Sequence, residues 1–575
     1  MKDSLNILGI NYGGHDTSAC LIINEKLIAA CEEERYSKIK HTREFPINAI
    51  NDCLKIGNIS IDELDEIALS IDPVYLIREN YLKSALEDEE RIEFLINDIE
   101  RIKQSYNIKE IIREKTKFKG TIRYHLHHHC HLASSYYVSG FDEALLVSHD
   151  GIGEIESSHF GVGKNGEIST IHKGTRYPNS LGLIYSAITH YLGWKHHSDE
   201  GIIMGLAPYG DDTKIIPDYG KTYRNVFKEI ILEDGDFDFI IEPSWISYYH
   251  VRDKWISEKF IDVFGPIRKP ETDVTEHHKN IAAALQNRIE EIILKQLKIA
   301  KERFQLKKLC FAGGVALNCV LNGKITENNL FDEIFVQPAS GDNGAALGAC
   351  LLSHKILKGN LSSKKIHDFY LGSKFTNDEI KEKLEQFSVQ YKFSENIYEE
   401  TASALKNGKI IGWFQGSAEF GPRALGNRSI LTSPFPKSMK DYLNSRVKFR
   451  EEFRPFAPAI LYEHTKEYFL LDQESPHMLI AVKVKENKID KIPAVVHIDN
   501  TARVQTVTKE NNLKFRKLLE SFYKITECPV LLNTSFNVKG QPIVNTPEDA
   551  IKCFLNTNID ILVLGDYILT KDNQN

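Results

Sequence analysis

The sequence predicts a two-domain α/β protein. The chain has 575 residues and a mass of 65.6 kDa, which is more than one ordinary hydrophobic core holds. Two consecutive segments, KKLCFAGGVALNCVLNGKI and EIFVQPASGDNGAALGAC, each read as a buried strand, a glycine turn and a new helix, an order typical of nucleotide-binding α/β domains. A polar stretch without periodicity near residues 355–366 then predicts a boundary between domains 1–360 and 361–575.

Further elements follow in order along the chain. The segment NILGINYGGHDTSACLIINEKLIAACEEER predicts two strands around Gly13–Gly14 and a third strand after them. Residues 85–117, charged and free of glycine, predict a surface helix pair, and an apolar stripe from Asn280 to Phe304 predicts an amphipathic helix. The second domain is expected to hold a helix at 397–407, strands at KIIGWFQG, MLIAVKV and CPVLLNTSF, and a final helix and strand over 547–569. We find no internal sequence repeat.

Composition argues against several classes of protein. With 42% hydrophobic and 26% charged residues the chain is typical of a soluble globular protein, and a net charge of −8 gives no basic field for a nucleic-acid partner. No run of 18 apolar residues and no signal-peptide pattern occur, so no membrane span is expected. Nine cysteines without a CxxC pair predict reduced, mostly buried thiols and a cytoplasmic location. The common NTPase, dehydrogenase and hydrolase glycine motifs are absent.

A histidine cluster in HLHHHCHLASSYYVSGFDEALLVSHDGIGE is the first candidate site. If this stretch is helical, His127 and His131 lie on one face at the spacing by which a helix offers two imidazoles to one cation. His125 and His129 have the same spacing, so spacing alone leaves both pairs open. A polar surface cluster that binds metal adventitiously is an alternative of about equal weight.

Two aspartates favour a built metal site. Asp150 ends the buried strand EALLVSHD, and α/β folds gather site residues at strand ends. Asp342 lies in the loop Gly341-Asp342-Asn343-Gly344, where small neighbours let a carboxylate and backbone amides approach a phosphate closely. Two imidazoles with one or two carboxylates suit Fe(II), Zn(II) or Mn(II) and leave positions open for a substrate oxygen.

Three further groups of residues could act in binding or catalysis. In the segment from Gly416 to Ile460, cationic residues alternate with glycine and proline, which favours a phosphate-binding loop over a helix. For any single arginine, a surface salt bridge with a neighbouring glutamate is about as probable as a phosphate contact. The polar run Asn533 to Asn537 after an apolar strand binds a small ligand or, as we favour from its sequence alone, forms a turn. His15, beside Asp16, could be a base or an oxyanion donor, or a structural residue of a turn. The cations in question are Arg423, Arg428, Arg446, Lys448, Arg450 and Arg454.

At these motifs the chain resembles a known family, the NodU/TobZ-type O-carbamoyltransferases. The resemblance extends from ILGINYGGHDTSACLI to NTSFNVKGQPIVNTPEDAI, nearly the whole sequence. Its most specific pieces are HHHCHLASSYYVSGF with HDGIGE, MGLAPYG, FAGGVALN, SGDNGAALGA, EFGPRALGNRSIL and FREEFRPFAPAIL. Several ordered motifs at compatible spacing make chance similarity improbable.

The resemblance implies a fold and an activity. It implies an N-terminal domain of the actin-like ATPase superfold (ASKHA, TsaD-like) and a YrdC-like α/β C-terminal domain. The second domain is expected to combine carbamoyl phosphate with ATP into carbamoyl adenylate, and the first to transfer the carbamoyl group to a hydroxyl of a small molecule or glycan at a divalent metal. Fe(II) is the favoured metal, with Zn(II), Mn(II) and Mg(II) as alternatives, and a homodimer is a further option. An adenylate is a good leaving group that must be kept from water, which makes such a division of labour chemically sensible.

The family's functional residues can be carried onto matching positions. The resemblance places the metal ligands at His127, His131, Asp150 and Asp342 and an assisting residue for the acceptor hydroxyl or carbamoyl group at His15. It places nucleotide contacts at Gly313, Gly314, Asn318 and Gly341. It assigns the carbamoyl-phosphate and ATP site to Arg423, Lys448, Arg454, Asn533, Ser535 and Asn537.

Two departures and two alternatives accompany this assignment. Ser417 stands where the family usually has an arginine, and Ile202 where it often has a lysine. Carbamoyl transfer to a protein cysteine is an alternative that would go with zinc-finger cysteine pairs, and a non-catalytic actin-like nucleotide-binding module is another. The acceptor is not identified by the sequence; its loops are expected in residues 70–120 or 212–275, where no specificity signal is readable.

Overall fold

The computed structural model describes residues 4–574 and resolves them into two compact units. The first unit contains the chain up to Ile28 and Arg43–Lys365, and the second contains Ala29–Thr42 and the chain from Ile366 onward. The segment Ala29–Thr42 therefore belongs to the second unit, although its sequence lies within the range 1–360 that we assigned to the first domain. The two units therefore do not correspond to two continuous stretches of sequence.

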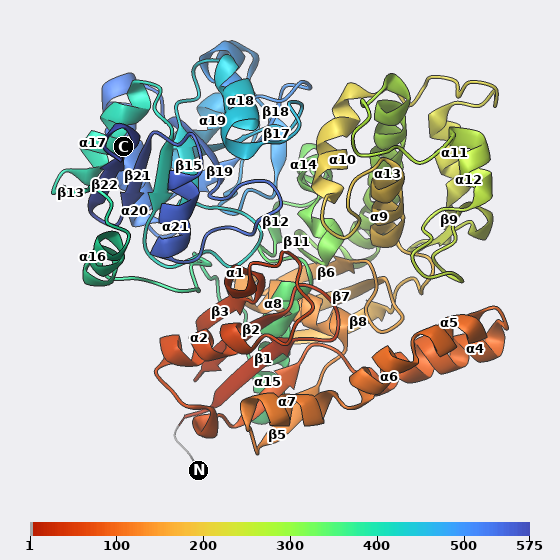
Figure 1. Ribbon diagram of the computed structural model, residues 1–575. Coiled ribbons are helices and arrows are strands. Elements are labelled where there is room, and N and C mark those ends of the chain that lie inside the picture. Colours follow the sequence, from red (N-terminus) through yellow and green to blue (C-terminus); the bar gives the residue numbers. More distant parts are fainter. Residues whose placement is uncertain (1–3, 575) are drawn as a thin grey trace. The chain divides into compact units, whose positions relative to one another are not determined.

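Two five-stranded sheets with one strand order contain most of the strands of the first unit (Figure 1), and β3 runs on from Lys26 in the first unit to Glu32, which is assigned to the second. The first sheet has the order β3-β2-β1-β4-β5 and the second the order β8-β7-β6-β11-β12. In each, an antiparallel pair (β1–β2, β6–β7) continues into two parallel neighbours (β1–β4–β5, β6–β11–β12). The duplicated topology leaves no sequence repeat because apolar pattern, not residue identity, sets strand pairing. The strands are β1 (Asn6–Asn11), β2 (Ser18–Ile23), β3 (Lys26–Glu32), β4 (Glu66–Leu69), β5 (Thr121–Tyr124), β6 (Glu143–His149), β7 (Ser158–Lys164), β8 (Glu167–His172), β11 (Lys308–Ala312) and β12 (Glu333–Val336).

Helices α8 (His127–Ser139) and α15 (Asp342–Lys358) pack on each other and join the two sheets. Helix α15 lies on β1 and β2, and α8 lies on β6 and β11. The approach is close: a Cβ atom at Gly348 would lie 1.9 Å from the carbonyl oxygen of Cys130, and one at Gly9 would lie 2.0 Å from that of Ala346. Each helix starts just after the carboxyl end of a strand, β5 or β12, so both helix N-termini lie at strand ends.

Most helices predicted for the first unit are present, with one difference in detail. The amphipathic helix is α13 (Glu276–Phe304), and the loop at Gly341 opens α15 as predicted. The predicted helix pair over 85–117 is a series of short helices preceded by a π-helical turn, Ile77–Lys83, because Asp88, Asp98 and Asn107 interrupt the helical run. The remaining elements are α2 (Ile47–Gly57), α3 (Pro73–Leu76), α4 (Ser84–Glu87), α5 (Arg91–Asn97), α6 (Ile99–Tyr106), α7 (Ile108–Thr116), α9 (Leu181–Tyr191), α10 (Glu200–Leu206), α11 (Tyr223–Ile230), β9 (Ile231–Asp234), β10 (Asp238–Ile241), α12 (Glu258–Phe264) and α14 (Cys319–Glu327).

An eight-stranded mixed sheet, in the order β13-β22-β21-β14-β15-β20-β16-β19, is the core of the second unit. Helix α20 packs with α17 and against β16 and β20, and α21 packs against β14 and β21. The arginine-rich segment, for which we predicted no strands, contributes β15 and β16, because its polar residues and prolines conceal the apolar alternation. The elements are α1 (Glu34–Ser37), α16 (Asn377–Gln386), β13 (Lys392–Phe393), α17 (Ile397–Lys406), β14 (Ile411–Phe414), β15 (Arg428–Thr432), α18 (Ser438–Leu443), β16 (Ala457–Leu461), α19 (Thr465–Tyr468), β17 (Ala481–Lys483), β18 (Thr501–Arg503), β19 (Gln505–Val507), α20 (Leu513–Thr526), β20 (Val530–Ser535), α21 (Pro547–Leu555), β21 (Ile561–Leu564) and β22 (Tyr567–Thr570).

Several coarse predictions are confirmed. Both units combine helices with sheets, as the α/β prediction requires. Eight of the nine cysteines are buried, and Cys553 is partly so. Between residues 4 and 574, none of the helices has the length and apolar character needed to cross a bilayer.

Candidate metal centre and anion site

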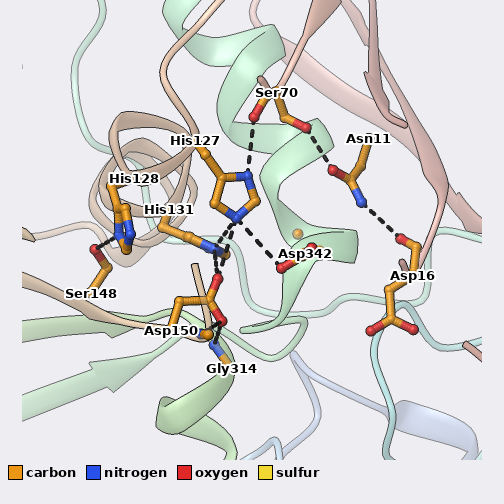
Figure 2. A network of polar contacts seen from close by, with 12 residues as sticks. Asn11, Asp16, Ser70, His127, His128, His131, Ser148, Asp150, Gly314 and Asp342 are labelled. Carbon is orange, nitrogen blue, oxygen red and sulfur yellow. Dashed lines mark hydrogen bonds and ion pairs between the residues drawn. The ribbon is translucent and has the colours of Figure 1, made fainter. Parts of the chain in front are cut away.

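Four predicted side chains converge at the strand ends of the first unit (Figure 2). His127 and His131 come from the first two turns of α8, Asp150 follows β6, and Asp342 is the first residue of α15. One ligand atom from each lies within 4.8 Å of every other. The Nε2 atoms of the two histidines are 3.0 Å apart, and Asp150 Oδ2 lies 2.9 Å from that of His131 and 3.3 Å from that of His127. Asp342 Oδ1 is 3.5 Å from His127 Nε2.

Backbone donors fix the carboxylate of Asp150. Its second oxygen, Oδ1, accepts hydrogen bonds from the N–H groups of Gly151 at 2.8 Å and Gly314 at 3.0 Å. A Cβ atom at Gly314 would lie 2.9 Å from this oxygen, so a larger residue would crowd it. The free oxygen Oδ2 is thereby directed at the two imidazoles.

A hydrogen-bonded chain orients His127 and connects it to the first strand (Figure 2). His127 Nδ1 lies 3.1 Å from the carbonyl oxygen of Ser70, to which its N–H donates when Nε2 is the unprotonated nitrogen. The Ser70 hydroxyl donates to Asn11 Oδ1 at 2.8 Å, and the Asn11 amide donates to the carbonyls of His15 and Asp16. Metal-binding histidines usually donate their second N–H to an oxygen in this manner. His131 Nδ1 has no such partner among the residues that the structure describes.

The local electrostatics favour an ionised Asp150 opposite the imidazoles. Burial opposes ionisation of Asp150, but His127 and His131 outweigh it and hold the pKa of this carboxyl well below its usual value. Burial likewise opposes a charged His127, yet Asp342 and Asp150 raise its pKa well above the ordinary value. Two carboxylates so close together favour the binding of a cation between them.

Glu154 holds the N-terminus of α8, a role that no sequence pattern indicated. It is 1% exposed, and its carboxylate accepts the backbone N–H groups of His127 and Asp72. Burial raises the pKa of this carboxyl to about 7. Glu154 thus fixes the start of the helix that presents both histidines.

His15 stands at the edge of the cluster. Its Nδ1 lies 2.9 Å from Asp16 Oδ2, and its Nε2 lies 4.0 Å from Asp342 Oδ2. Its side chain is 32% exposed, against 5% for His127 and 0% for His131. Burial is outweighed by Asp342, Asp16 and Asp150, which raise the pKa of His15 to about 10. The ring is therefore oriented by one aspartate and accessible to a substrate.

The structure separates the two histidine pairs that spacing left open. His125 Nε2 lies 2.7 Å from the hydroxyl of Ser353, away from Asp150. His128 contacts the hydroxyl of Ser148 at 2.7 Å and the carbonyl of Glu156 at 2.8 Å. His129 packs its ring edge-on against His159, 5.0 Å between centroids. Only His127 and His131 belong to the four-residue cluster of the described chain.

The residues predicted to contact a nucleotide have structural roles here. Gly313 has φ +85°, and a Cβ atom on it would lie 2.2 Å from the carbonyl oxygen of His149. Asn318 caps α14 by accepting the N–H of Leu321 and exchanges two hydrogen bonds with Gln286, at 3.0 and 3.1 Å. Gly341 precedes the first residue of α15. A nucleotide contact at these positions stays a prediction.

The second unit contains a buried lysine in a polar cradle. Lys448 is 3% exposed, and its ammonium group donates to the carbonyl of Ser535 at 2.5 Å and to Asn537 Oδ1 at 2.7 Å. Two further contacts reach the Ser535 hydroxyl at 3.1 Å and the Asn537 carbonyl at 3.0 Å. Three predicted residues are thus brought together. Asn533 instead lies within the sheet, where its amide donates to Gln505 and Ala424.

Neighbouring cations act on Lys448 and on Arg450, and Glu451 pairs with Arg454 at 3.5 Å. Burial, followed by the charges of Arg450, Arg454 and Lys40, lowers the pKa of Lys448 well below its usual value. Burial, Arg454 and Arg503 do the same to the pKa of Arg450. We call Lys448, Arg450, Arg454 and Arg503 the cation cluster. Several positive side chains gathered around two buried cations favour the binding of an anion.

One cluster member and one neighbour escaped the sequence prediction. Arg450 was among the candidate cations of the basic segment, whereas Arg503 and Lys40 lie outside that segment and outside the polar run Asn533 to Asn537. Arg503 ends β18, and Lys40 belongs to the exchanged segment Ala29–Thr42. Only the tertiary fold could have identified them.

Other cations of the basic segment have different tasks. Arg428 is 0% exposed, stacks 3.6 Å from the centroid of Phe414, and donates to the carbonyls of Gln415 and Ser373. Burial lowers its pKa to about 9. Arg446 is exposed, and Arg423 is half-buried in the loop before β15. Arg428 is a structural residue, and a phosphate contact of Arg423 stays a prediction.

Glu419 shapes the loop that precedes β15. One of its carboxylate oxygens accepts the backbone N–H groups of Leu425 at 2.9 Å, Asn427 at 2.9 Å and Arg428 at 3.0 Å. The residue is 3% exposed. The sequence suggests Glu419 only as a surface salt-bridge partner; buried and bound to three amides, it is a scaffold of the glycine-rich loop.

Family models match both parts of the chain. A model described as the carbamoyltransferase N-terminus matches residues 6–351, and one described as the carbamoyltransferase C-terminus matches residues 402–571. The chain belongs to the carbamoyltransferase family. The resemblance inferred from its motifs is thereby confirmed, and the chain is an enzyme of carbamoyl transfer.

Named proteins similar to this carbamoyltransferase cover most of its length. Nodulation protein NolNO of Sinorhizobium fredii is 34% identical over 97% of this chain and 79% of its own. Nodulation protein NolO of Bradyrhizobium diazoefficiens is 38% identical over 77% of this chain and 78% of its own. The 3'-hydroxymethylcephem-O-carbamoyltransferase of Streptomyces clavuligerus is 30% identical over 68% of this chain and 69% of its own. Among solved structures, HypF of T. kodakarensis is 15% identical over 62% of this chain and 49% of its own, with a TM-score of 0.32, too weak a similarity to support an argument.

The two departures from the family pattern have plain structural settings in this carbamoyltransferase. Ile202 is 2% exposed in α10, so the site of the missing lysine is an apolar packing position. Ser417 offers its carbonyl oxygen to the Asn427 amide at 2.8 Å.

Proposed function

We propose that the protein is an ATP-dependent O-carbamoyltransferase that works in two steps at two sites. Carbamoyl adenylate forms from carbamoyl phosphate and ATP at the cation cluster of the second unit. The carbamoyl group then passes to a hydroxyl of a small molecule or glycan at the histidine–aspartate cluster of the first unit. The observation that supports this most directly is that a carbamoyltransferase chain has one cluster of cationic side chains around the buried Lys448 and one cluster of histidines and aspartates, in different units.

The cation cluster suits the first step. Arginine binds phosphate oxygens in bidentate fashion, and a buried lysine adds a point charge. Atom balance requires that water releases phosphate from carbamoyl phosphate and that a carbamate oxygen then attacks the α-phosphorus of ATP, displacing pyrophosphate. Lys448 and its neighbours would stabilise the charge that builds up on the α-phosphate. Burial and neighbouring positive charges lower the pKa values of Lys448 and Arg450, and a bound phosphate group would counter both effects.

The histidine–aspartate cluster suits the second step. The acceptor hydroxyl oxygen attacks the carbamoyl carbon, its proton passes to Nε2 of a neutral His15, the bond from that carbon to the adenylate oxygen breaks, and AMP leaves. His15 is the accessible group at this place, and Asp16 holds its ring by Nδ1 so that Nε2 faces the cluster. We place the acceptor hydroxyl at His15 Nε2.

A divalent metal fits the residues present. The donor set is two imidazoles and two carboxylates whose ligand atoms lie close together, and the Ser70 carbonyl beside His127 Nδ1 would favour the tautomer with a free Nε2. His127, His131, Asp150 and Asp342 would hold the ion, which would supply a Lewis acid and a counter-charge for the phosphate of the adenylate. Fe(II) is our first choice and Zn(II), Mn(II) and Mg(II) are alternatives.

The finer fold assignments belong to the same proposal. The duplicated strand order of the first unit, with sites at the strand ends between α8 and α15, supports an actin-like ATPase fold for it. A YrdC-like fold is proposed for the second unit on the motif resemblance. The small-molecule acceptor has support from the cephem O-carbamoyltransferase of Streptomyces clavuligerus, which is similar to 68% of the chain.

Separating the two steps tests the proposal. Radiolabelled pyrophosphate should exchange into ATP in the presence of carbamoyl phosphate and without any acceptor. Lys448→Ala should abolish this exchange, whereas His131→Ala should retain it and lose carbamoyl transfer. Arg446→Ala, an exposed cation of the same segment, is the matched control and should behave as wild type.

Two outcomes would count against the proposal. ADP as the sole nucleotide product would exclude adenylate formation. Loss of the same step in Lys448→Ala and His131→Ala would contradict the assignment of two sites.

A further inference from the structure

Three short helices of the first unit, α4, α5 and α6, have no part in the chemistry described so far. Figure 1 shows them as an arm that extends from the sheets, with α4 and α5 at its far end. We call α4–α6 the helical arm. Helix α4 packs on α5, and the π-helical turn Ile77–Lys83 packs on α5 and α6. The chain therefore runs out along the arm and returns through α5 and α6.

The buried side of α5 and α6 carries charged side chains. Arg91 and Asp98 are 1% and 8% exposed, and Phe94, between them in the chain, is 5% exposed. The guanidinium carbons of Arg91 and Arg252 lie 3.9 and 4.1 Å from the centroid of the Phe94 ring. Arg252 also donates through Nε to Asp98 Oδ1 at 3.0 Å. Ionic and cation–π contacts, and not an aliphatic stripe, therefore hold these helices to the unit.

The loop of Trp255, residues 247–255, supplies the other side of these contacts. In addition to Arg252, it offers the carbonyl of Tyr249, to which Arg91 donates. It also places His250 Nε2 at 2.8 Å from Asp88 Oδ2. The return run is thus fastened before, within and after α5. Its outer side is held in a fixed orientation, and such a surface loses little conformational freedom when it binds.

The outer side of the return run is apolar. Four large side chains on it are 47%, 60%, 44% and 70% exposed, namely those of Ile92, Ile96, Ile99 and Tyr106. They recur at intervals of four, three and seven residues, and hydrogen bonds from Asp98 to Phe94 and from Ile102 to Asp98 carry the helical pattern across the break between α5 and α6. We call these four residues the apolar stripe; it is about 21 Å long. A surface helix normally buries such a stripe, so its exposure indicates an interaction surface.

Charge is distributed unevenly along the same part of the chain. Residues 87–93 include five acidic side chains and one arginine, whereas residues 101–119 include seven basic and two acidic ones. Glu93 is exposed and forms no ion pair within residues 4–574. Lys103 pairs with the exposed Glu100 of its own helix at 2.7 Å, a surface contact that a second carboxylate can join. The run is therefore acidic at its start and basic at its end.

We propose that the apolar stripe is a homodimer interface, in which α5 and α6 of one copy pack antiparallel on the same helices of a second copy. A twofold axis at Ile99, the midpoint of the stripe, places Ile92 opposite Tyr106 of the second copy. It also brings Glu93 within two residues of the position opposite Lys103 of the second copy. The surface is then complementary to itself in apolar contact and in charge, as a twofold interface requires. This inference goes beyond the proposed function and does not depend on it.

The dimensions of the stripe set the expected strength. Two helical faces of this length bury less than the roughly 1,200 Å² at which standard interfaces begin, so the dimer is weak. We expect a dissociation constant on the order of 10 µM. A parallel arrangement would bring like charges together, and an anionic membrane, another common partner of an apolar helix face, would be repelled by the acidic end.

Sedimentation velocity of the full chain between about 1 and 200 µM, a range that brackets this constant, tests the proposal. The wild type should shift from monomer to dimer as its concentration rises. Ile96→Glu should raise the dissociation constant by about tenfold or more. Ile215→Glu is the matched control, because Ile215 is 65% exposed and lies outside the arm, and it should leave the constant unchanged. Glu93→Lys and Lys103→Glu should each weaken the dimer, and their combination should restore it by restoring unlike charges across the axis.

Cysteine cross-linking locates the axis. Ile99→Cys should form a disulfide between two copies under mild oxidation, because helices about 8–10 Å apart bring facing residues on a twofold axis within disulfide reach. Ile215→Cys and the wild type, whose nine cysteines are buried or partly so, are the controls and should stay largely monomeric on a non-reducing gel.

Four outcomes would overturn the proposal. These are a wild type that stays monomeric at every concentration, a dimer that Ile96→Glu leaves intact, a charge exchange that does not restore the dimer, and cross-linking of Ile99→Cys no stronger than that of Ile215→Cys. A wild-type melting temperature for Ile96→Glu shows that the variant is folded, and if it melts lower, the cross-linking result decides. Binding to vesicles of phosphatidylcholine and phosphatidylglycerol that Ile96→Glu abolishes, without a dimer, would assign the stripe to a membrane surface instead.

Discussion

Replacing Asp150 by asparagine should remove most of the stabilisation that a divalent metal gives to the first unit. A ligand at 1,000 times its dissociation constant stabilises a fold by about 4 kcal/mol, which for a unit of this size raises the melting temperature by on the order of 10 °C. The Asp150→Asn side chain would keep a carbonyl oxygen for the Gly151 and Gly314 amides but lose the anionic oxygen that faces His127 and His131.

The size of the effect follows from affinity. Loss of a partner that only orients a ligand costs about 10- to 100-fold in metal affinity, so loss of a charged ligand should cost about 100-fold or more. At unchanged metal concentration the stabilisation then falls to about 1.4 kcal/mol, roughly a third of its former value. The metal-free variant should also lose about 1.5 to 3 kcal/mol, because two imidazoles lose a charged hydrogen-bond partner.

Thermal unfolding of metal-free protein, titrated with Mn(II), Zn(II) or Mg(II) and with Fe(II) under anaerobic conditions, measures both quantities. Asp238→Asn is the matched control, since Asp238 pairs with His172 at 3.0 Å outside the cluster. The reasoning is refuted if none of the four metals raises the melting temperature of the wild type. It is equally refuted if Asp150→Asn responds as the wild type does.

Four further results are expected. His15→Asn should slow carbamoyl transfer by roughly 10²- to 10⁴-fold and leave pyrophosphate exchange unchanged. If kinetic assays show that both carbamoyl transfer and pyrophosphate exchange are lost, the assignment of His15 to the transfer step is wrong. Arg503→Ala should raise the KM for carbamoyl phosphate or ATP about tenfold or more, and an unchanged KM would remove Arg503 from the cation cluster. Glu419→Ala should lower the free energy of unfolding in urea by about 3 kcal/mol or more, because three buried backbone amides lose their hydrogen-bond acceptor. Glu419→Gln should be intermediate in stability between Glu419→Ala and the wild type. Equal stability of the wild type and both variants would contradict this prediction. Gly313→Ala should lower the free energy of unfolding by about 3 kcal/mol or more, because the new Cβ atom would clash with the His149 carbonyl. Gly235→Ala is the control and should cost about 1 kcal/mol, since Gly235 also has a positive φ but has open space around it. Equal costs for the two variants would contradict the predicted clash.

Local sequence patterns were sufficient to predict most helices and strands. They failed for strands that contain charged residues or proline. The hairpin around Gly13, the helix α13 and the strands β6, β14 and β20 follow from apolar periodicity and turn residues, which act over a few positions. Strands β15 and β16 were missed because Arg428 and Pro458, inside them, do not read as strand residues. Arg428 is tolerated there because it is satisfied by backbone carbonyls and an aromatic ring.

The sequence alone determined the α/β class, the carbamoyltransferase resemblance and the chemical types at the two sites, because short motifs record local backbone shape and ligand chemistry. Only the tertiary structure decided between His127–His131 and His125–His129, since helical spacing is identical and the difference lies in which face meets Asp150. It alone added Arg503 and Lys40 to the anion site and joined the loop of Trp255 to the helical arm. Those placements depend on contacts between segments tens to hundreds of residues apart, and no local pattern encodes them.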